Sequence, residues 1–280
     1  MRVLVVGRGW LGRPAIEHLG AVAFPHAGIS TDLPADSAAV RLRDAIRPDE
    51  GTVLVNLCGL RYGAREDLHT SNAHIPLIMA AALAGSGAHL VHVGSAAEYG
   101  VPADPRPLSE ESVCSPTSDY GVTKLSGTQA VLDAMPTATV LRPFNVVDAD
   151  LPQGSPMGDI SDRINRAITG RTPVEVLAAS TIRDYVSRQF VIESITAAAR
   201  LRPAGVFNVC SGVGVSTGDI ARMVLDDRQI ANAITSSDDA QSSTIIGDPT
   251  RWRALTGLAE ALGCRGVVET LGWSGEGVGA

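Results

Sequence analysis

A single lysine, Lys124, stands among the 23 lysine and arginine residues of this 280-residue chain, four residues after Tyr120. Residues four apart share one face of a helix, so the phenol and the ammonium would lie side by side. An ammonium beside a phenol favours the phenolate, which suits the phenol to proton transfer near neutral pH. Arginine is no equivalent here, because a guanidinium is a planar fork and an ammonium a compact point charge. The pair predicts acid–base chemistry at a carbonyl, as in hydride transfer.

A hydroxyl group follows the apolar run His89–Val93, which is typical of a buried strand. Ser95 could hydrogen-bond the same carbonyl oxygen that Tyr120 would protonate. We therefore take Ser95, Tyr120 and Lys124 as the candidate catalytic residues.

Three closely spaced glycines follow the first apolar run, Arg2–Val6, and open a helical stretch that extends to Leu19. In a dinucleotide-binding GxGxxG turn the first glycine allows the tight turn, the second lets backbone approach the pyrophosphate, and the third lets helix pack on strand. The N-terminus of the helix then faces the phosphates. The candidate cofactor-binding residues of this turn are Gly7, Arg8, Gly9, Trp10, Leu11 and Gly12.

The residues after the second expected strand bear on the choice between NAD and NADP. An acid about 20 residues beyond the turn usually holds the ribose 2′-hydroxyl of NAD. The second expected strand, Ala21–Phe24, is followed by Pro25 and His26 and by no acid. Arg8 and His26 could instead reach a 2′-phosphate, which favours NADP and keeps NAD as the alternative. Asp32 and Leu33 are a competing candidate for this part of the cofactor site: they could supply the acid that holds the ribose or a contact with the adenine.

Apolar runs alternate with helical patterns through the first half of the chain, which predicts an α/β fold with a Rossmann-type doubly wound parallel sheet. Strands are expected at Arg2–Val6, Ala21–Phe24, Gly28–Asp32, Thr52–Leu57, His89–Val93, Thr139–Arg142 and Val206–Val209. Helices are expected at Trp10–Leu19, Ser37–Arg47, Asn72–Ala84, Asp119–Ala134, Ile160–Ile168, Thr217–Leu225 and Pro249–Leu262.

The composition changes after Asn145, since residues 148–182 are rich in proline, glycine and aspartate. We expect a nucleotide-binding Rossmann domain over residues 1–147, to which 184–210 return. A smaller C-terminal substrate-binding lobe would consist of residues 148–183 and 211–280.

Composition excludes several classes of protein. The net charge of −7, with no basic cluster, argues against nucleic-acid binding. The longest apolar run, Ile75 to Gly85, is too short to span a membrane, and the N-terminus lacks a signal-peptide pattern. The four cysteines form no CxxC motif and no evident disulfide framework, and no metal site is expected. These features predict a cytoplasmic protein with reduced thiols.

Motifs along most of the chain resemble the NAD-dependent epimerase/dehydratase family of extended short-chain dehydrogenases/reductases. Besides the glycine turn they are Asp32-Leu33 and the segments at 94–100, 120–124, 141–146, 183–186, 207–209 and 247–251. The resemblance implies that Ser95, Tyr120 and Lys124 are catalytic and that Lys124 also holds the ribose of the nicotinamide.

The same resemblance implies further contacts with the cofactor. Pro143 and Phe144 would lie beside the nicotinamide, and Cys58 and Gly59 would line the cofactor. Asn72 matches an asparagine whose role in the family is mostly structural.

The two residues after Ser95 narrow the choice among the reactions that the family catalyses. Members that resemble sugar 4,6-dehydratases carry an Asp-Glu pair there, where this chain has Ala96 and Ala97. Alanine is neither acid nor base, and a one-residue shift would turn Glu98 to the opposite face of a strand, so we interpret Glu98 as a solvated or paired carboxylate. That leaves 4-epimerisation or ketoreduction, and the missing acid after Phe24 together with Arg8 favours ketoreduction with NADP. An NAD-dependent nucleotide-sugar 4-epimerase is the alternative, and a non-catalytic NADP-binding sensor is a third hypothesis.

Ala96, Ala97, Asn145 and Arg183 are the candidate substrate-binding residues. The last two match residues that hold the nucleotide diphosphate in sugar epimerases, and an arginine fork suits phosphate. The family's second phosphate arginine is absent, because residues 231–246 contain no cation. We therefore expect a nucleotide-activated deoxyketosugar or a similar ketone. The helices expected at Asn72–Ala84 and Asp119–Ala134 resemble a four-helix dimer interface and predict a homodimer.

Overall fold

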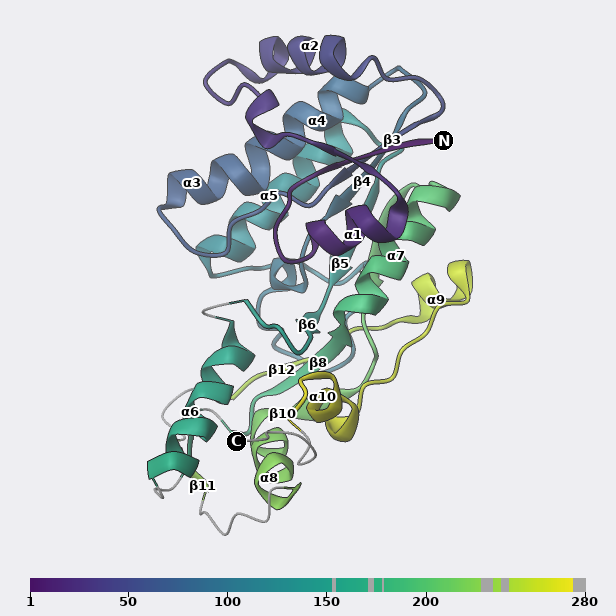
Figure 1. Ribbon diagram of the computed structural model, residues 1–280. Coiled ribbons are helices and arrows are strands. Elements are labelled where there is room, and N and C mark those ends of the chain that lie inside the picture. The colour runs from purple at the N-terminus through teal and green to yellow at the C-terminus, as the bar shows by residue number, and fades with distance from the viewer. Residues whose placement is uncertain (153–154, 171–173, 178, 228–233, 238–241, 274–280) are drawn as a thin grey trace.

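The larger part of the computed structural model is a parallel sheet with helices on both faces (Figure 1). The structure describes residues 1–152, 155–170, 174–177, 179–227, 234–237 and 242–273. Among these residues, six strands pair in the order β2-β1-β3-β4-β5-β9, all in parallel. Their bounds are β1 Arg2–Val6, β2 Val22–Phe24, β3 Thr52–Asn56, β4 His89–Val93, β5 Thr139–Pro143 and β9 Gly205–Val209. The predicted α/β doubly wound fold is confirmed.

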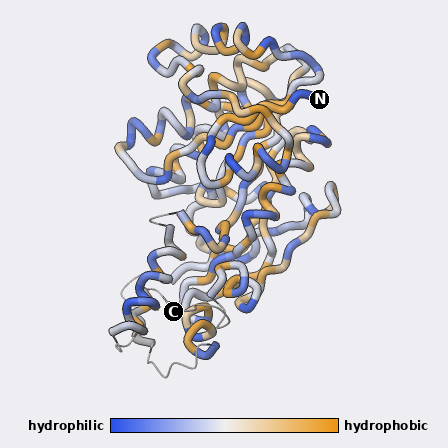
Figure 2. Tube along the Cα trace, in the orientation of Figure 1, coloured by the Kyte–Doolittle hydropathy of each residue, from blue (hydrophilic) through white to orange (hydrophobic). Residues whose placement is uncertain are grey.

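Two hydrophobic layers enclose this sheet, as expected for a parallel sheet that is buried on both faces. One layer packs α2, α4 and α5 on the face that carries Leu54 and Leu90. The other packs α1 and α7 on the face that carries Val53 and Val55. Figure 2 shows the apolar residues gathered along these strands. The helices are α1 Gly12–Leu19, α2 Ala35–Ile46, α4 Ile75–Leu83, α5 Asp119–Ala134 and α7 Arg188–Leu201.

A smaller, mixed sheet lies beyond the carboxyl ends of the main strands (Figure 1). Its central strand is β8, Ile182–Ser187, which pairs in parallel with β6, Asn145–Val147, and with β12, Thr244–Ile245. An antiparallel partner, β10 (Gly214–Ser216), completes it. A separate parallel pair joins β7, Val174–Leu177, to β11, Ile234–Ser237. The helices of this region are α6 Pro156–Gly170, α8 Thr217–Asp227 and α10 Cys264–Thr270.

Two predicted elements were wrong. The strand expected at Gly28–Asp32 is absent: a 3-10 turn spans His26–Gly28, and a bend leads to α2. Pro25 and Pro34 flank this short segment, and proline gives no N–H to a sheet ladder. The helix expected at Pro249–Leu262 is shorter, because α9, Thr250–Thr256, ends at Gly257, where φ is 72°. A left-handed glycine is a common end of a helix.

The helical layer beside β4 positions the N-terminal end of α5. A short helix, α3 (Arg65–His69), runs through a π-helical turn, Thr70–His74, into α4. A Cβ on Gly127 of α5 would lie 1.9 Å from the Asn72 carbonyl oxygen in that turn, so only glycine allows this approach. The Asn72 amide also accepts from the Leu60 N–H and donates to Thr123 Oγ1. This packing joins α5 to the loop that follows β3.

Within the described part of the chain, every helix is too short or too polar to cross a membrane.

Candidate active site

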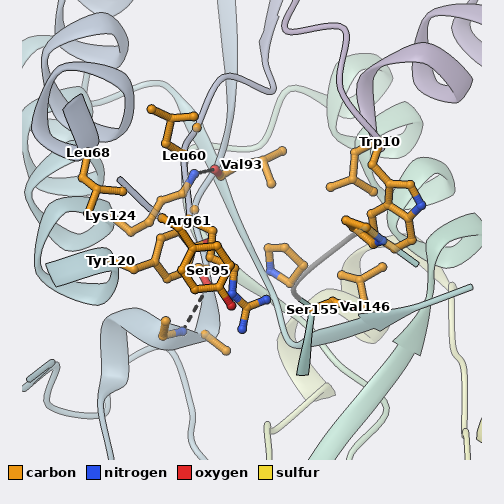
Figure 3. Close-up of a pocket in the computed structure, with 18 of the residues that line it drawn as sticks. Trp10, Leu60, Arg61, Leu68, Val93, Ser95, Tyr120, Lys124, Val146 and Ser155 are labelled. Carbon is orange, nitrogen blue, oxygen red and sulfur yellow. Dashed lines mark hydrogen bonds between the residues drawn. The ribbon is translucent and has the colours of Figure 1, made fainter. Parts of the chain in front are cut away.

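A cavity of about 700 Å³ opens at the carboxyl ends of β1, β3, β4 and β5. Ligands of open α/β sheets bind at this edge, outside the ends of the strands. Figure 3 shows Ser95, Tyr120 and Arg61 on one side of the cavity and Trp10 on the other. The predicted site residues that line it are Trp10, Leu11, Cys58, Gly59, Ser95, Ala96, Ala97, Tyr120, Lys124, Pro143, Phe144 and Asn145.

Tyr120 and Lys124 project from the first turns of α5. Ser118 caps this helix by accepting a hydrogen bond from the Gly121 N–H at 3.1 Å. The Lys124 ammonium donates to the carbonyl oxygen of Val93 at 3.0 Å, and the residue is only 5% exposed. This hydrogen bond joins α5 to the last residue of β4 and holds the ammonium against the cavity wall.

Ser95 begins the tight turn that follows β4. Its Oγ accepts a hydrogen bond from the Ala97 N–H at 3.2 Å, so the hydroxyl hydrogen is not used in that contact. The Glu98 carboxylate accepts from the Ser95 N–H at 2.9 Å, which completes a capping box around the turn. Ala96 and Ala97, inside the turn, line the cavity.

Glu98 is fully buried and turned away from the cavity, as the interpretation of a paired carboxylate required. It accepts from Arg142 Nε at 2.8 Å and from Thr128 Oγ1 at 3.0 Å. The Arg142 guanidinium lies 4.8 Å from the centre of the Tyr99 ring, and the Tyr99 hydroxyl donates to Asn208. Burial raises the pKa of the Glu98 carboxyl, and the Arg142 charge opposes this rise.

The glycine turn fits a dinucleotide. A Cβ on Gly12 would lie 1.9 Å from the Gly7 carbonyl oxygen, and one on Gly7 would lie 2.6 Å from backbone atoms of Leu57. These two glycines therefore allow strand, turn and helix to meet closely. A Cβ on Gly9 would meet nothing within 4 Å, so its backbone is open to a ligand. These contacts match the division of roles that a pyrophosphate site requires.

The loop after β3 forms the wall between the glycine turn and Lys124. The Cys58 N–H donates to the Asn56 side chain at 2.9 Å, and the Asn72 amide donates to the Leu60 carbonyl oxygen at 2.8 Å. Burial raises the pKa of the Cys58 thiol to about 11, so this residue is a neutral part of the wall.

The residues expected near the adenosine lie outside the cavity wall. Arg8 is exposed at the glycine turn, and His26 and Asp32 are exposed beyond β2. Leu33 is partly buried against the hydrophobic layer that contains α2.

The two expected phosphate-binding residues are placed differently. Asn145 lines the cavity, and its amide donates to the Asp184 carbonyl oxygen at 2.8 Å. Arg183 is not among the lining residues. Its guanidinium donates to the carbonyl oxygen of Ser243 at 2.7 Å and to Ser243 Oγ at 2.8 Å, which ties β8 to the segment before β12.

The cavity also has lining residues that the sequence analysis did not single out. They are Leu57, Leu60, Arg61, Tyr62, Gly63, Leu68, Val93, Gly94, Ser118, Asp119, Val146, Pro152 and Ser155. Position in the sequence offered one signal, because residues 58–63 directly follow the strand expected at Thr52–Leu57 and must emerge at the edge of the sheet where ligands bind.

The Glu98 contacts generate a prediction about stability. Glu98→Gln leaves the buried Arg142 charge without its counter-ion, which should destabilise the fold by about 3 kcal/mol or more. Thermal unfolding should show a melting temperature lower by about 6 °C or more. Turnover measured at temperatures well below this melting point should also be reduced, because the Ser95 N–H loses a charged acceptor.

Glu111→Gln is the matched control, since Glu111 is highly exposed in its pair with Arg251 and such pairs contribute little. If Glu98→Gln had the same melting temperature as the wild type, the role of Glu98 as the buried counter-ion of Arg142 would be contradicted.

Comparisons with known proteins identify relatives of this chain. The model of the family described as NAD dependent epimerase/dehydratase matches residues 8–210. The chain is 27% identical over 255 residues to dTDP-6-deoxy-L-talose 4-dehydrogenase (NAD(P)(+)) of Kitasatospora kifunensis, covering 88% of this chain and 78% of the relative. It is 28% identical over 185 residues to dTDP-4-dehydrorhamnose reductase of Mycolicibacterium smegmatis, covering 63% and 54%.

Solved structures support the same fold. RMD from Pseudomonas aeruginosa, complexed with NADPH, superposes with a TM-score of 0.77 at 21% identity and covers 98% of both chains. At this identity the likeness shows the fold alone.

Proposed function

We propose that this chain, which belongs to the NAD dependent epimerase/dehydratase family and is an NAD(P)-dependent oxidoreductase of the extended short-chain type, reduces the ketone of a nucleotide-activated deoxyketosugar with NADPH. The observation that carries the proposal is the meeting of Ser95, Tyr120 and Lys124 in one cavity beside the glycine turn. The two curated relatives are by name a dTDP-sugar dehydrogenase and a dTDP-sugar reductase, which supports a nucleotide sugar as the substrate.

The roles of the side chains follow from their contacts. A bound nicotinamide would supply the hydride. Tyr120 donates its proton to the ketone oxygen. Ser95 donates its hydroxyl hydrogen to the same oxygen, since its Oγ already accepts from the Ala97 N–H. Lys124 stabilises the phenolate that remains, with its ammonium held by the Val93 carbonyl. Gly7, Gly9 and Gly12 would hold the pyrophosphate, and Pro143 and Phe144 would lie beside the nicotinamide.

Elimination of water from the sugar has no support in the cavity wall. Ala96 and Ala97 line it where dehydratases of the family carry their acids, and Glu98 is buried against Arg142. Among the described lining residues the one carboxylate is Asp119, which pairs with Arg65. Reduction needs only the proton of Tyr120.

The choice of NADP over NAD rests on charge near β2. No acid follows the strand at residues 25–28, and Arg8 is exposed at the glycine turn. A guanidinium there suits the 2′-phosphate of NADP, and the exposed His26 would assist it. A 4-epimerase, in contrast, keeps NAD bound through each turnover.

Tyr120→Phe removes the proton donor. We expect kcat to fall at least about a hundredfold, with NADPH binding unchanged when measured by fluorescence titration.

Lys124→Arg should be nearly inactive as well, because a guanidinium does not replace the compact ammonium. Full turnover in either variant would exclude the catalytic scheme.

Mass spectrometry of the purified protein tests the cofactor and the reaction together. Loosely held NADP(H) is expected for the reductase. In addition, Arg8→Ala should weaken the binding of NADPH about tenfold and leave the binding of NADH unchanged. Tightly retained NAD would indicate the epimerase instead. Binding of NADPH with no turnover on any nucleotide-linked ketosugar would indicate a sensor.

We also propose a homodimer through the outer faces of α4 and α5. Leu77 on α4 and Val122 and Leu125 on α5 are half-buried there, and a dimer interface would cover them. Light scattering should give twice the chain mass of 29.1 kDa. A mass equal to one chain would refute the dimer.

A further inference from the structure

Arg61 places a positive charge in the wall of the cavity, beside the catalytic tyrosine. Its guanidinium carbon lies 5.9 Å from the centre of the Tyr120 ring and 5.7 Å from that of the Tyr62 ring. The residue is exposed and lines the cavity, and Figure 3 shows it next to Ser95 and Tyr120. No hydrogen bond or ion pair joins it to any residue in the described part of the chain.

The other charges of the described wall are already engaged. Lys124 is buried and donates to the Val93 carbonyl. Asp119 lies 3.6 Å from the Nε of Arg65, which lies outside the lining. The positive charge of Arg61 is therefore unmatched within the wall, and it gives this side of the cavity an attraction for anions.

Arg183 matches a phosphate-binding residue of the sugar epimerases that the sequence resembles, but it does not supply a positive charge to the cavity wall. Its three hydrogen bonds go to the carbonyl oxygens of Ile182 and Ser243 and to the Ser243 hydroxyl. Burial lowers the pKa of the Arg183 guanidinium, and moving it into the cavity would break all three of these hydrogen bonds. Arg61 is thus the free guanidinium of the described wall.

We propose that Arg61 binds an anionic oxygen group of the substrate, a phosphate or a carboxylate, next to the ketone that Tyr120 protonates. This rests on the proposed function, because it assumes that the sugar ring lies between Ser95 and Tyr120. The Tyr62 and Tyr120 rings hold the guanidinium through cation–π contacts, which leaves its N–H fork free for a bidentate contact. The anion lies on the substrate side of the tyrosine, and Arg61 selects charged ketosugars over neutral ones.

Binding of two probe anions to the protein saturated with NADPH tests this assignment without turnover. Inorganic pyrophosphate represents the diphosphate of a nucleotide sugar, and glucuronate represents a carboxylate on the sugar ring. Saturation with NADPH keeps pyrophosphate out of the glycine turn. Isothermal titration calorimetry then compares the wild type with Arg61→Gln and with Arg65→Gln. The second variant removes the same charge four residues away, at a side chain outside the cavity wall.

The expected result is that one of the anions binds the wild type and binds Arg61→Gln at least about tenfold more weakly, with Arg65→Gln unchanged. The anion that responds identifies the group: pyrophosphate indicates a phosphate, and glucuronate a carboxylate. Arg61→Lys should keep part of the affinity, because it retains the charge and loses the fork.

Three results would overturn the proposal: neither anion binds the wild type, Arg61→Gln binds both as the wild type does, or both glutamine variants lose affinity equally. Failure of the reductase scheme is separate, since it shows as persistent turnover in Tyr120→Phe whatever the anions do.

Discussion

The buried ion pair between Glu98 and Arg142 connects the elements around the site. Glu98 bonds the turn after β4 through the Ser95 N–H, α5 through Thr128 and β5 through Arg142. Arg142 packs on Tyr99, whose hydroxyl reaches Asn208 on β9. Two buried charges are costly to desolvate and stabilise a fold only when their hydrogen bonds are satisfied. One carboxylate therefore joins the Ser95 turn, α5 and β5, and Tyr99 links this group to β9.

The two cations among the described lining residues of the cavity are held in different ways. Lys124 is buried and held by a carbonyl at the end of β4, and it lies one helical turn after Tyr120 on α5. Arg61 is exposed, and within the described part of the chain its guanidinium contacts aromatic rings and makes no hydrogen bond. A compact ammonium suits a fixed electrostatic role and a planar fork suits recognition of an anion.

The second region uses its charged residues to hold itself together. Asp184 accepts from the backbone N–H groups of Ser211, Gly212 and Gly247, and Arg183 bonds the Ser243 carbonyl. These contacts join β8 to two segments that are distant from it in sequence, residues 211–212 and 243–247. Among the described lining residues, the cation that makes no hydrogen bond, Arg61, comes from the loop after β3 in the main sheet.

The sequence alone determined what depends on short spacing. Tyr120 and Lys124 are one helical turn apart, and the glycine turn lies between a strand and a helix, so local geometry suffices to predict both. The strong strands were predictable because buried parallel strands are continuous apolar runs. The strand expected at Gly28–Asp32 did not form: a 3-10 turn and a bend occupy the short segment between Pro25 and Pro34.

Only the tertiary structure decided which distant side chains meet. Glu98 and Arg142 lie 44 residues apart, and Arg183 and Ser243 lie 60 apart. Such pairs have no period or spacing that a sequence displays, because they form only when strands and loops pack. The same packing engaged the arginine that the motif indicated and left Arg61 facing the cavity.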